Sequence, residues 1–203
     1  MLSHLRKAVT PLKLGLAAPL AKAGIDPNWV TLAAIPFALG AMGAAATGHF
    51  WLALSLAIPA GLADFLDGAV AELLNRHTPQ GNFLEACVDR VVDGFLLGGL
   101  VVRYPFLSVI AMTLSFTISY IKARVGLVIE ADNSDWPGWG DRTDRLALTV
   151  LAYAGAAYSF QAGQGALALL VFICTVGSFQ RMRHAFKLIK AAQANGTLLS
   201  YLK

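Results

Sequence analysis

Long apolar runs alternate with short polar segments along almost the whole chain. Because a helix of about twenty apolar residues spans a bilayer, we interpret six of these runs as transmembrane helices. They lie at residues 29–47, from 51 to about 67, 83–102, 105–121, 146–160 and 165–179, and the fourth is expected to continue as a helix to about Glu130. The pattern predicts an all-α, polytopic membrane protein whose transmembrane region covers residues 29–190.

The first 23 residues have a different pattern, in which basic residues alternate with apolar residues at helical spacing. A helix with a basic face and an apolar face is typical of a segment that lies on an anionic membrane surface. We therefore predict an amphipathic interfacial helix over residues 1–23, broken near Pro11. A solvated N-terminal helix is the alternative that the pattern leaves open.

The composition is that of a membrane protein. Of the 203 residues, 57% are hydrophobic and 14% are charged, and the mean hydropathy is +0.61. This balance argues against an ordinary soluble domain, and no nucleic-acid partner is indicated. Cys87 and Cys174 both lie in apolar runs, which indicates neither a disulfide framework nor a zinc site. With no repeat or linker in the sequence, residues 1–203 are expected to form a single domain.

The basic residues predict the orientation of the spans, because positively charged loops stay in the cytoplasm. With the N-terminus inside, the cytoplasmic segments hold all but two of the sixteen basic residues, since Arg103 lies in an outside loop and Arg90 lies within a span. We therefore expect a protein of the cytoplasmic membrane. Both termini and the polar turn at residues 75–82 are expected on the cytoplasmic side.

Half of the twelve acidic residues fall within residues 64–93, between strongly apolar flanks. They are Asp64, Asp67, Glu72, Glu85, Asp89 and Asp93. A carboxylate at the centre of a membrane helix costs roughly 2.5–3.5 kcal/mol, so the cluster needs a compensating partner. Ion pairs with Arg76 and Arg90 are one alternative, but two bases do not neutralise six acids.

The spacing of these acids places them on facing sides of two helices. Asp64 and Asp67 are three residues apart, and Glu85, Asp89 and Asp93 follow at four-residue steps, so each set shares one helix face. The short polar turn between the helices brings the two faces together. Ligation by carboxylates alone suits Mg²⁺ or Mn²⁺, and four or more acids are enough for two ions.

A pair of divalent ions at a membrane surface is suited to phosphoryl or pyrophosphate chemistry, because it stabilises the attacking and leaving oxygens together. A free carboxylate can take the proton of an attacking hydroxyl group. Basic residues at the cytoplasmic ends of the spans fit an anionic substrate, above all Arg145 and Arg181. The full group is Lys122, Arg124, Arg142, Arg145 and Arg181. Arg183, Lys187 and Lys190 are interpreted as interfacial side chains instead.

These residues resemble the signature of the CDP-alcohol phosphatidyltransferases, which reads D-x2-D-G-x2-A-R and then, eight residues later, G-x3-D-x3-D. The matching residues, in order and spacing, are Asp64, Asp67, Gly68, Ala71, Gly81 and Asp89. The likeness extends to PNWVT before the first span and SYIKAR at the end of the fourth. Within the family, LEACVDRVVDG, RTDRL and FQR are most similar to the actinobacterial phosphatidylinositol phosphate synthases.

The resemblance implies transfer of a phosphatidyl group from CDP-diacylglycerol to inositol phosphate, with release of CMP. Glycerol 3-phosphate is the alternative acceptor, and a homodimer is the implied assembly. The implied metal ligands are Asp64, Asp67, Glu85 and Asp89, and Asp89 is also the implied general base. The implied CDP-diacylglycerol site comprises Asn28, Trp29, Val30, Thr31, Gly68, Ala71, Glu72 and Thr78. The implied acceptor-phosphate site comprises Lys122, Arg124, Arg145 and Arg181.

Two positions differ from the family pattern. Glu72 stands where the signature has an arginine, and Glu85 stands where it has an aspartate. Glu85 keeps an oxygen ligand, displaced by roughly 1–1.5 Å at a fixed backbone, whereas Glu72 reverses a charge toward the nucleotide. Three explanations stay open: a working enzyme with a compensating group, a weak or non-catalytic family member, and a chain altered for study.

Two other classes of protein share some of these features. An intramembrane prenyltransferase also uses paired aspartate-rich motifs with Mg²⁺, but such chains are longer and lack the D-G-x2-A…G pattern. A divalent-cation channel needs acids along a path through the bilayer, whereas these acids gather near one side. The sequence therefore favours the transferase.

Overall fold

The computed structural model describes residues 6–129, 136 and 138–199. In this part of the chain the structure is helical, apart from an isolated bridge between Ile129 and Leu198. The helices are α1 (Arg6–Lys22), α2 (Pro27–Ala46), α3 (Phe50–Leu74), α4 (Pro79–Gly99), α5 (Pro105–Val125), α6 (Arg142–Tyr158) and α7 (Phe160–Asn195). The prediction of an all-α protein is confirmed.

Four of the described helices, α2, α3, α5 and α7, are long and apolar enough to cross a membrane. Large apolar side chains point outward along them: Leu39, Ile58, Ile110 and Phe172 are between 44% and 57% exposed. An apolar outer surface of this extent is unfavourable in water and matches the acyl chains of lipids. The protein is therefore integral to a membrane.

The expected third and fifth spans correspond to α4 and α6, which do not belong to this group of four. α4 has 21 residues but carries Glu85, Asp89, Arg90 and Asp93, and α6 has only 17 residues. Both helices lie beside longer ones, so their polar positions face protein as well as the membrane. A total of six spans stays a prediction.

Two helix boundaries near the acidic residues differ from those expected. α1 runs without a break through Pro11, because α1 packs against α3 and buries Ala17 completely. The turn between α3 and α4 is shorter than residues 75–82, since α4 already begins at Pro79. Proline is favourable in the first turn of a helix, and the Thr78 hydroxyl accepts a 3.0 Å hydrogen bond from the Gly81 backbone nitrogen.

The helix that follows the fourth apolar run is also shorter than expected. α5 ends at Val125, and residues 126–129 form a turn that leads to the bridge with Leu198. Glu130, where we expected the helix to end, lies outside the described residues, as do residues 132–135 and 137 of the loop at 132–140.

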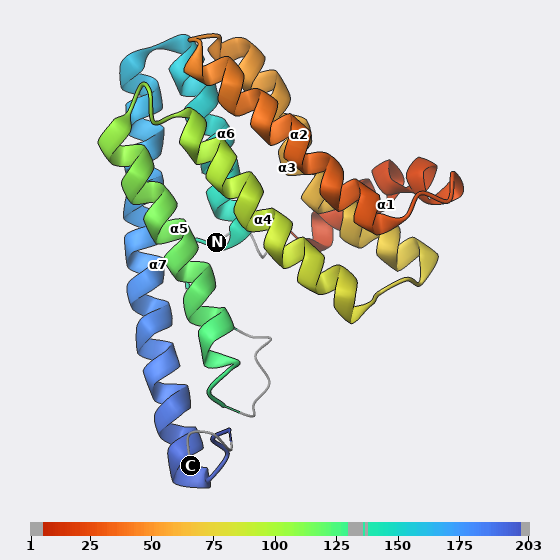
Figure 1. Ribbon diagram of the computed structural model, residues 1–203, viewed down its shortest axis with the longest axis vertical. Helices are drawn as coiled ribbons and strands as arrows, with labels where there is room; N and C mark the ends of the chain where they lie inside the picture. The colour runs from red at the N-terminus through yellow and green to blue at the C-terminus, as the bar shows by residue number, and fades with distance from the viewer. Residues whose placement is uncertain (1–5, 130–135, 137, 200–203) are drawn as a thin grey trace.

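Small side chains allow the helices around the acidic segment to approach closely. In Figure 1, α2 lies along α3 and α5 lies along α7, while α4 crosses between the two pairs. Ala38 and Ala41 of α2 and Ala53, Ala57 and Ala60 of α3 are fully buried in the main core. Helices that meet through alanine and glycine pack at short distances in membranes. This packing holds α3 and α4 in place beside α2.

The contact between α6 and α7 depends on Gly155. A Cβ atom at this position would lie 2.7 Å from the carbonyl carbon of Ala162 and from the backbone nitrogen of Gly163. We therefore expect Gly155→Ala to lower the free energy of unfolding by about 1–3 kcal/mol, measured by thermal unfolding in detergent. Gly165→Ala is the matched control on α7, because nothing lies within 4 Å of its added Cβ. Equal stability of the two variants would contradict the close α6–α7 contact.

Candidate functional site

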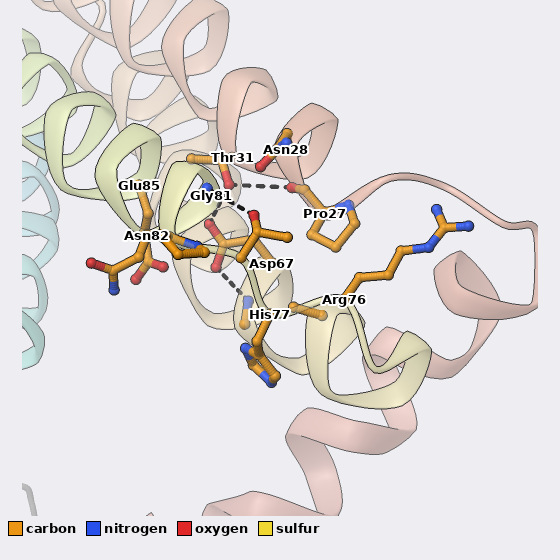
Figure 2. A pocket seen from close by; sticks show the side chains of 13 residues that line it. Pro27, Asn28, Thr31, Asp67, Arg76, His77, Gly81, Asn82 and Glu85 are labelled. Atoms are coloured by element: carbon orange, nitrogen blue, oxygen red, sulfur yellow. Dashed lines mark hydrogen bonds between the residues drawn. The ribbon is translucent and has the colours of Figure 1, made fainter.

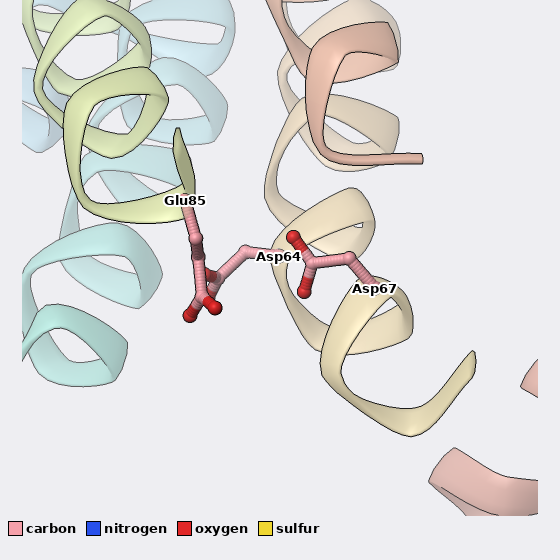
Figure 3. A group of neighbouring side chains, drawn as sticks. All are labelled: Asp64, Asp67 and Glu85. Carbon is pink, nitrogen blue, oxygen red and sulfur yellow. The ribbon is translucent and has the colours of Figure 1, made fainter. Parts of the chain in front are cut away.

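Three carboxylates from two helices converge on one point. Asp64 and Asp67 of α3 and Glu85 of α4 each offer one oxygen atom, and these oxygens lie within 4.8 Å of one another (Figure 3). The cluster contains no histidine or cysteine among the described residues. Such an all-oxygen donor set fits a hard divalent cation such as Mg²⁺ or Mn²⁺. Glu85 reaches this point although the family pattern has the shorter aspartate there.

Asp67 is held firmly in this cluster. Its side chain is only 3% exposed. One carboxylate oxygen accepts a 2.7 Å hydrogen bond from the Thr31 hydroxyl of α2, and the other accepts a 2.6 Å bond from the Gly68 backbone nitrogen. Because a buried carboxylate needs such partners, α2 contributes directly to the orientation of a candidate metal ligand.

Arg142, at the start of α6, lies among the same carboxylates. Its guanidinium group forms ion pairs with Asp64 and, at 2.9 Å, with Asp89, and its Nε atom lies 3.9 Å from Asp93. The side chain is 15% exposed. Arg142 is not among the site residues that the sequence predicts. It lies nearly fifty residues beyond Asp93, and only the packing of α6 against α3 and α4 brings it here.

Asp89, the predicted fourth metal ligand and general base, lies one turn beyond Glu85 on α4. It does not belong to the three-carboxylate cluster, but Arg142 joins it to Asp64. The side chain of Asp89 is largely buried and also lies 3.5 Å from Arg90. Asp89 and Asp93 therefore form a second acidic group beside the first, and the guanidinium group of Arg142 lies between the two groups.

The predicted acceptor residues Arg145 and Arg181 are both buried, at 4% and 6% exposure. Arg145 contacts Asp93 at 3.2 Å and donates a 2.8 Å hydrogen bond to the Gly140 carbonyl oxygen. Arg181 contacts Asp141 at 2.8 Å. Each guanidinium group therefore has a protein partner, and Arg145 lies close enough to Arg181 for the two charges to interact.

The other two predicted acceptor residues lie near the end of α5. Lys122 is partly buried and Arg124 is exposed. Both lie at the end of α5 that leads into the turn at residues 126–129. It shows no contact between Arg124 and the acidic cluster among the described residues.

A cavity of about 490 Å³ opens beside the cluster, and its wall includes both Asp67 and Glu85 (Figure 2). Five of the predicted CDP-diacylglycerol residues line it: Asn28, Thr31, Gly68, Ala71 and Thr78. Lining residues that the sequence analysis missed include Arg76, His77 and Asn82. Arg76 and His77 lie between α3 and α4, and Asn82 lies in the first turn of α4. The signal in the sequence was the closeness of this polar stretch to Asp64 and Asp67.

Three predicted nucleotide-site residues lie elsewhere. Trp29 is 69% exposed on the outer face of α2, whereas Val30 is buried between α1 and α3. Glu72 is exposed and does not line the cavity. The charge reversal at position 72 therefore does not place a carboxylate in the cavity wall.

The cavity lies at the N-terminal ends of two helices. Pro27, Asn28 and Thr31 come from the start of α2, and Pro79 and Gly81 come from the start of α4. Helix N-termini carry partial positive charge and unpaired backbone N–H groups, which favour phosphate groups. A cavity with carboxylates on one side and two helix N-termini on the other suits a phosphate ligand bound together with a divalent cation.

Known proteins share both the sequence and the fold. Residues 25–178 match the family profile of CDP-alcohol phosphatidyltransferase. A phosphatidylinositol phosphate synthase of Mycobacteroides abscessus is 33% identical over 155 residues, which cover 71% of this chain and 67% of that protein.

Two crystal structures of the phosphatidylinositol phosphate synthase of Mycobacterium tuberculosis, each 25% identical in sequence, resemble this fold. The one with CDP-DAG bound has a TM-score of 0.71 and covers 87% of this chain and 94% of its own. The one in complex with manganese and citrate has a TM-score of 0.72, with 86% and 88% covered. With four of the six matching signature residues in the wall of one cavity and three quarters of its length matched, this chain belongs to the CDP-alcohol phosphatidyltransferase family.

Proposed function

We propose that this protein transfers a phosphatidyl group from CDP-diacylglycerol to inositol phosphate, giving phosphatidylinositol phosphate and CMP. One observation carries the proposal: Asp67 and Glu85 belong both to the acidic cluster and to the wall of the cavity between two helix N-termini. A diphosphate in that cavity would lie beside a divalent ion that these carboxylates would hold. The relatives support the choice of substrates, because those described above are named for phosphatidylinositol phosphate synthesis.

The donor would bind with its nucleotide in the cavity. Asn28, Thr31 and Thr78 offer polar groups, and Gly68 lacks a side chain that would keep a diphosphate away from α3. The small side chain of Ala71, about one turn further along α3, also leaves room in the cavity. Trp29, exposed beside the cavity entrance on α2, is placed to contact the lipid part of the donor.

Asp89 would serve as the general base. It takes the proton of the inositol hydroxyl group while that oxygen attacks the phosphorus atom bonded to diacylglycerol, and the bond from this phosphorus to the CMP oxygen breaks. CMP and the phospholipid product then leave the site.

We propose that Asp64, Asp67, Glu85 and Asp89 hold two divalent ions, Mg²⁺ or Mn²⁺. When bound, these ions neutralise the diphosphate and stabilise the departing CMP. Arg142 now occupies the space between Asp64 and Asp89. It would have to shift when a second ion binds these two carboxylates.

The acceptor phosphate would bind at the arginines beside this site. Lys122, Arg124, Arg145 and Arg181 form the predicted set, and the structure adds Arg142 as a candidate because it reaches Asp89. Arginine suits this role, since its planar group matches a phosphate with two hydrogen bonds.

In the membrane we propose six spans, with α4 and α6 crossing together with the four longer helices. The termini and the site would face the cytoplasm, where most of the basic residues lie. α1 would lie at the interface, which fits the 64% exposure of Leu12 and the 51% exposure of Leu16. We infer a single domain over residues 1–203 and, from the family resemblance, a homodimer.

The test is CMP release by the purified protein in detergent with CDP-diacylglycerol. Inositol phosphate, glycerol 3-phosphate, free inositol and no acceptor are compared, each with Mg²⁺, Mn²⁺ or a chelator. We expect turnover with inositol phosphate and a divalent ion, and none after chelation. Turnover with glycerol 3-phosphate alone would overturn the acceptor assignment.

The Glu72→Arg/Glu85→Asp variant tests whether the two departures from the family pattern impair the enzyme. Because Glu85 reaches the cluster and Glu72 stays outside the cavity, we expect the native chain to be active already. Silence of the native chain with activity in the variant would show a degraded family member.

A further inference from the structure

Lys13 of α1 lies directly beside the candidate donor site. Its ammonium nitrogen is 3.4 Å from the point that a Cβ atom on Gly68 would occupy. Gly68 lines the cavity between Asp67 and Ala71. The ammonium group therefore lies over Gly68, where no side chain separates the backbone of α3 from the cavity.

The position of Lys13 is set by helix packing. Ala17, one turn further along α1, is fully buried against Ala69 and Val70 of α3, and Leu14 packs on the same cluster. Lys13 also lies over the ring of Phe65, with 5.7 Å between the ammonium nitrogen and the ring centroid. A lysine that only reached for the membrane surface would extend away from the protein, as the exposed Lys22 at the end of the same helix does.

Lys13 makes no ion pair with any described residue. Its ammonium group lies over Gly68, the residue that follows Asp67 of the acidic cluster. An ammonium group held there without an ion pair to a carboxylate is available to a bound anion.

The basic residues in the cavity wall itself are Arg76 and His77 among the described residues. The side chain of Arg76 is 57% exposed and lies 3.9 Å from Asp26. Much of its charge is therefore screened by solvent and by this carboxylate. Residue 72, one helical turn beyond Gly68, is a glutamate and lies outside the wall. The face of α3 at Gly68 therefore receives its positive charge from another helix.

We propose that Lys13 binds the diphosphate of CDP-diacylglycerol over Gly68, and so makes α1 part of the donor site. In this way α1 supplies a positive charge near Gly68 of α3, a helix that has Glu72 where the family pattern has an arginine. The inference rests on the proposed function, because it takes a nucleotide diphosphate as the ligand.

The test compares Lys13→Gln, Lys13→Arg and, as the matched control on the same helix, Lys22→Gln. Binding of CDP in the presence of Mn²⁺ is measured by calorimetry on the full chain in detergent. CDP has no acyl chains, so a change in membrane attachment of α1 does not enter this result. We expect Lys13→Gln to weaken CDP binding about tenfold, the size of one lost charge-assisted hydrogen bond, while Lys13→Arg and Lys22→Gln bind as the native chain does.

Turnover distinguishes donor binding from a general defect. Lys13→Gln is expected to raise the KM for CDP-diacylglycerol and to leave the KM for inositol phosphate unchanged. Lys13→Arg, which keeps the positive charge, is expected to keep the native KM for CDP-diacylglycerol. A loss in Lys13→Gln that the charge-conserving Lys13→Arg variant shares would show that Lys13 only supports helix packing.

Native-like CDP binding by Lys13→Gln would overturn the proposal, and so would equal losses in Lys13→Gln and Lys22→Gln. The proposed function fails separately: a native chain that binds CDP but does not use inositol phosphate leaves the role of Lys13 testable by CDP binding alone.

Discussion

Asp89→Asn is expected to lower turnover by about 10³-fold, the middle of the range for loss of a general base, while CDP and a divalent ion still bind. The amide has the same shape as the carboxylate but cannot take a proton from the acceptor hydroxyl group. The fold should persist, because Arg142 keeps its ion pair with Asp64 and lies 3.9 Å from Asp93. The cluster of Asp64, Asp67 and Glu85 remains complete.

Three measurements on this variant separate the roles of Asp89. CMP release gives kcat, calorimetry gives CDP affinity, and the number of Mn²⁺ ions bound reports whether both cation sites still fill. A large fall in kcat with unchanged CDP affinity and both ions bound fits a base, whereas loss of one ion fits a metal ligand. Turnover within a factor of about ten of the native rate is too small a loss for a general base, and Asp89 would then be only a partner of Arg142.

Arg145→Leu is expected to lower the free energy of unfolding by about 3–5 kcal/mol, because removal of one member of a buried ion pair leaves the other uncompensated. Asp93, at 6% exposure, would keep only the more distant Arg142, with its Nε atom at 3.9 Å, and the 3.5 Å hydrogen bond from the Ser115 hydroxyl. The carbonyl group of Gly140 would also lose its 2.8 Å hydrogen bond. This expectation treats Arg145 as part of the framework as well as a phosphate ligand.

The matched control is Arg145→Leu/Asp93→Leu, in which both members of the pair become apolar. Replacing a whole buried pair is often neutral or stabilising, so thermal unfolding in detergent should show recovery of much of the loss. If the single variant is as stable as the native chain and only the KM for inositol phosphate rises, Arg145 acts as a phosphate ligand without a structural role.

The acidic cluster was predictable because its geometry is local. Asp64 and Asp67 share a helix face by their three-residue spacing, as do Glu85 and Asp89 by their four-residue spacing. The turn between the two helices is too short to let these faces separate. The length of the turn was less predictable, because proline is found both in turns and in the first turn of a helix. α4 begins at Pro79, capped by Thr78, four residues earlier than we expected.

The partners of these acids were not predictable from the sequence. Arg142 and Arg145 were expected to face an anionic substrate, yet one joins Asp64 to Asp89 and the other pairs with Asp93. Which cation meets which carboxylate depends on how α6 packs against α3 and α4. That packing is a sum of many small contacts, to which no single residue spacing points.

The sequence by itself determined the helical class, the apolar runs, the two acidic faces and the family. Each of these follows from a period or spacing within a single segment, which helix geometry converts directly into a position in space. Only the tertiary structure decided that Glu72 lies outside the cavity, that α1 runs through Pro11 to bring Lys13 over Gly68, and that Arg142 lies among the carboxylates. These are contacts between helices distant in the chain, and the close packing of buried side chains across several elements determines them together.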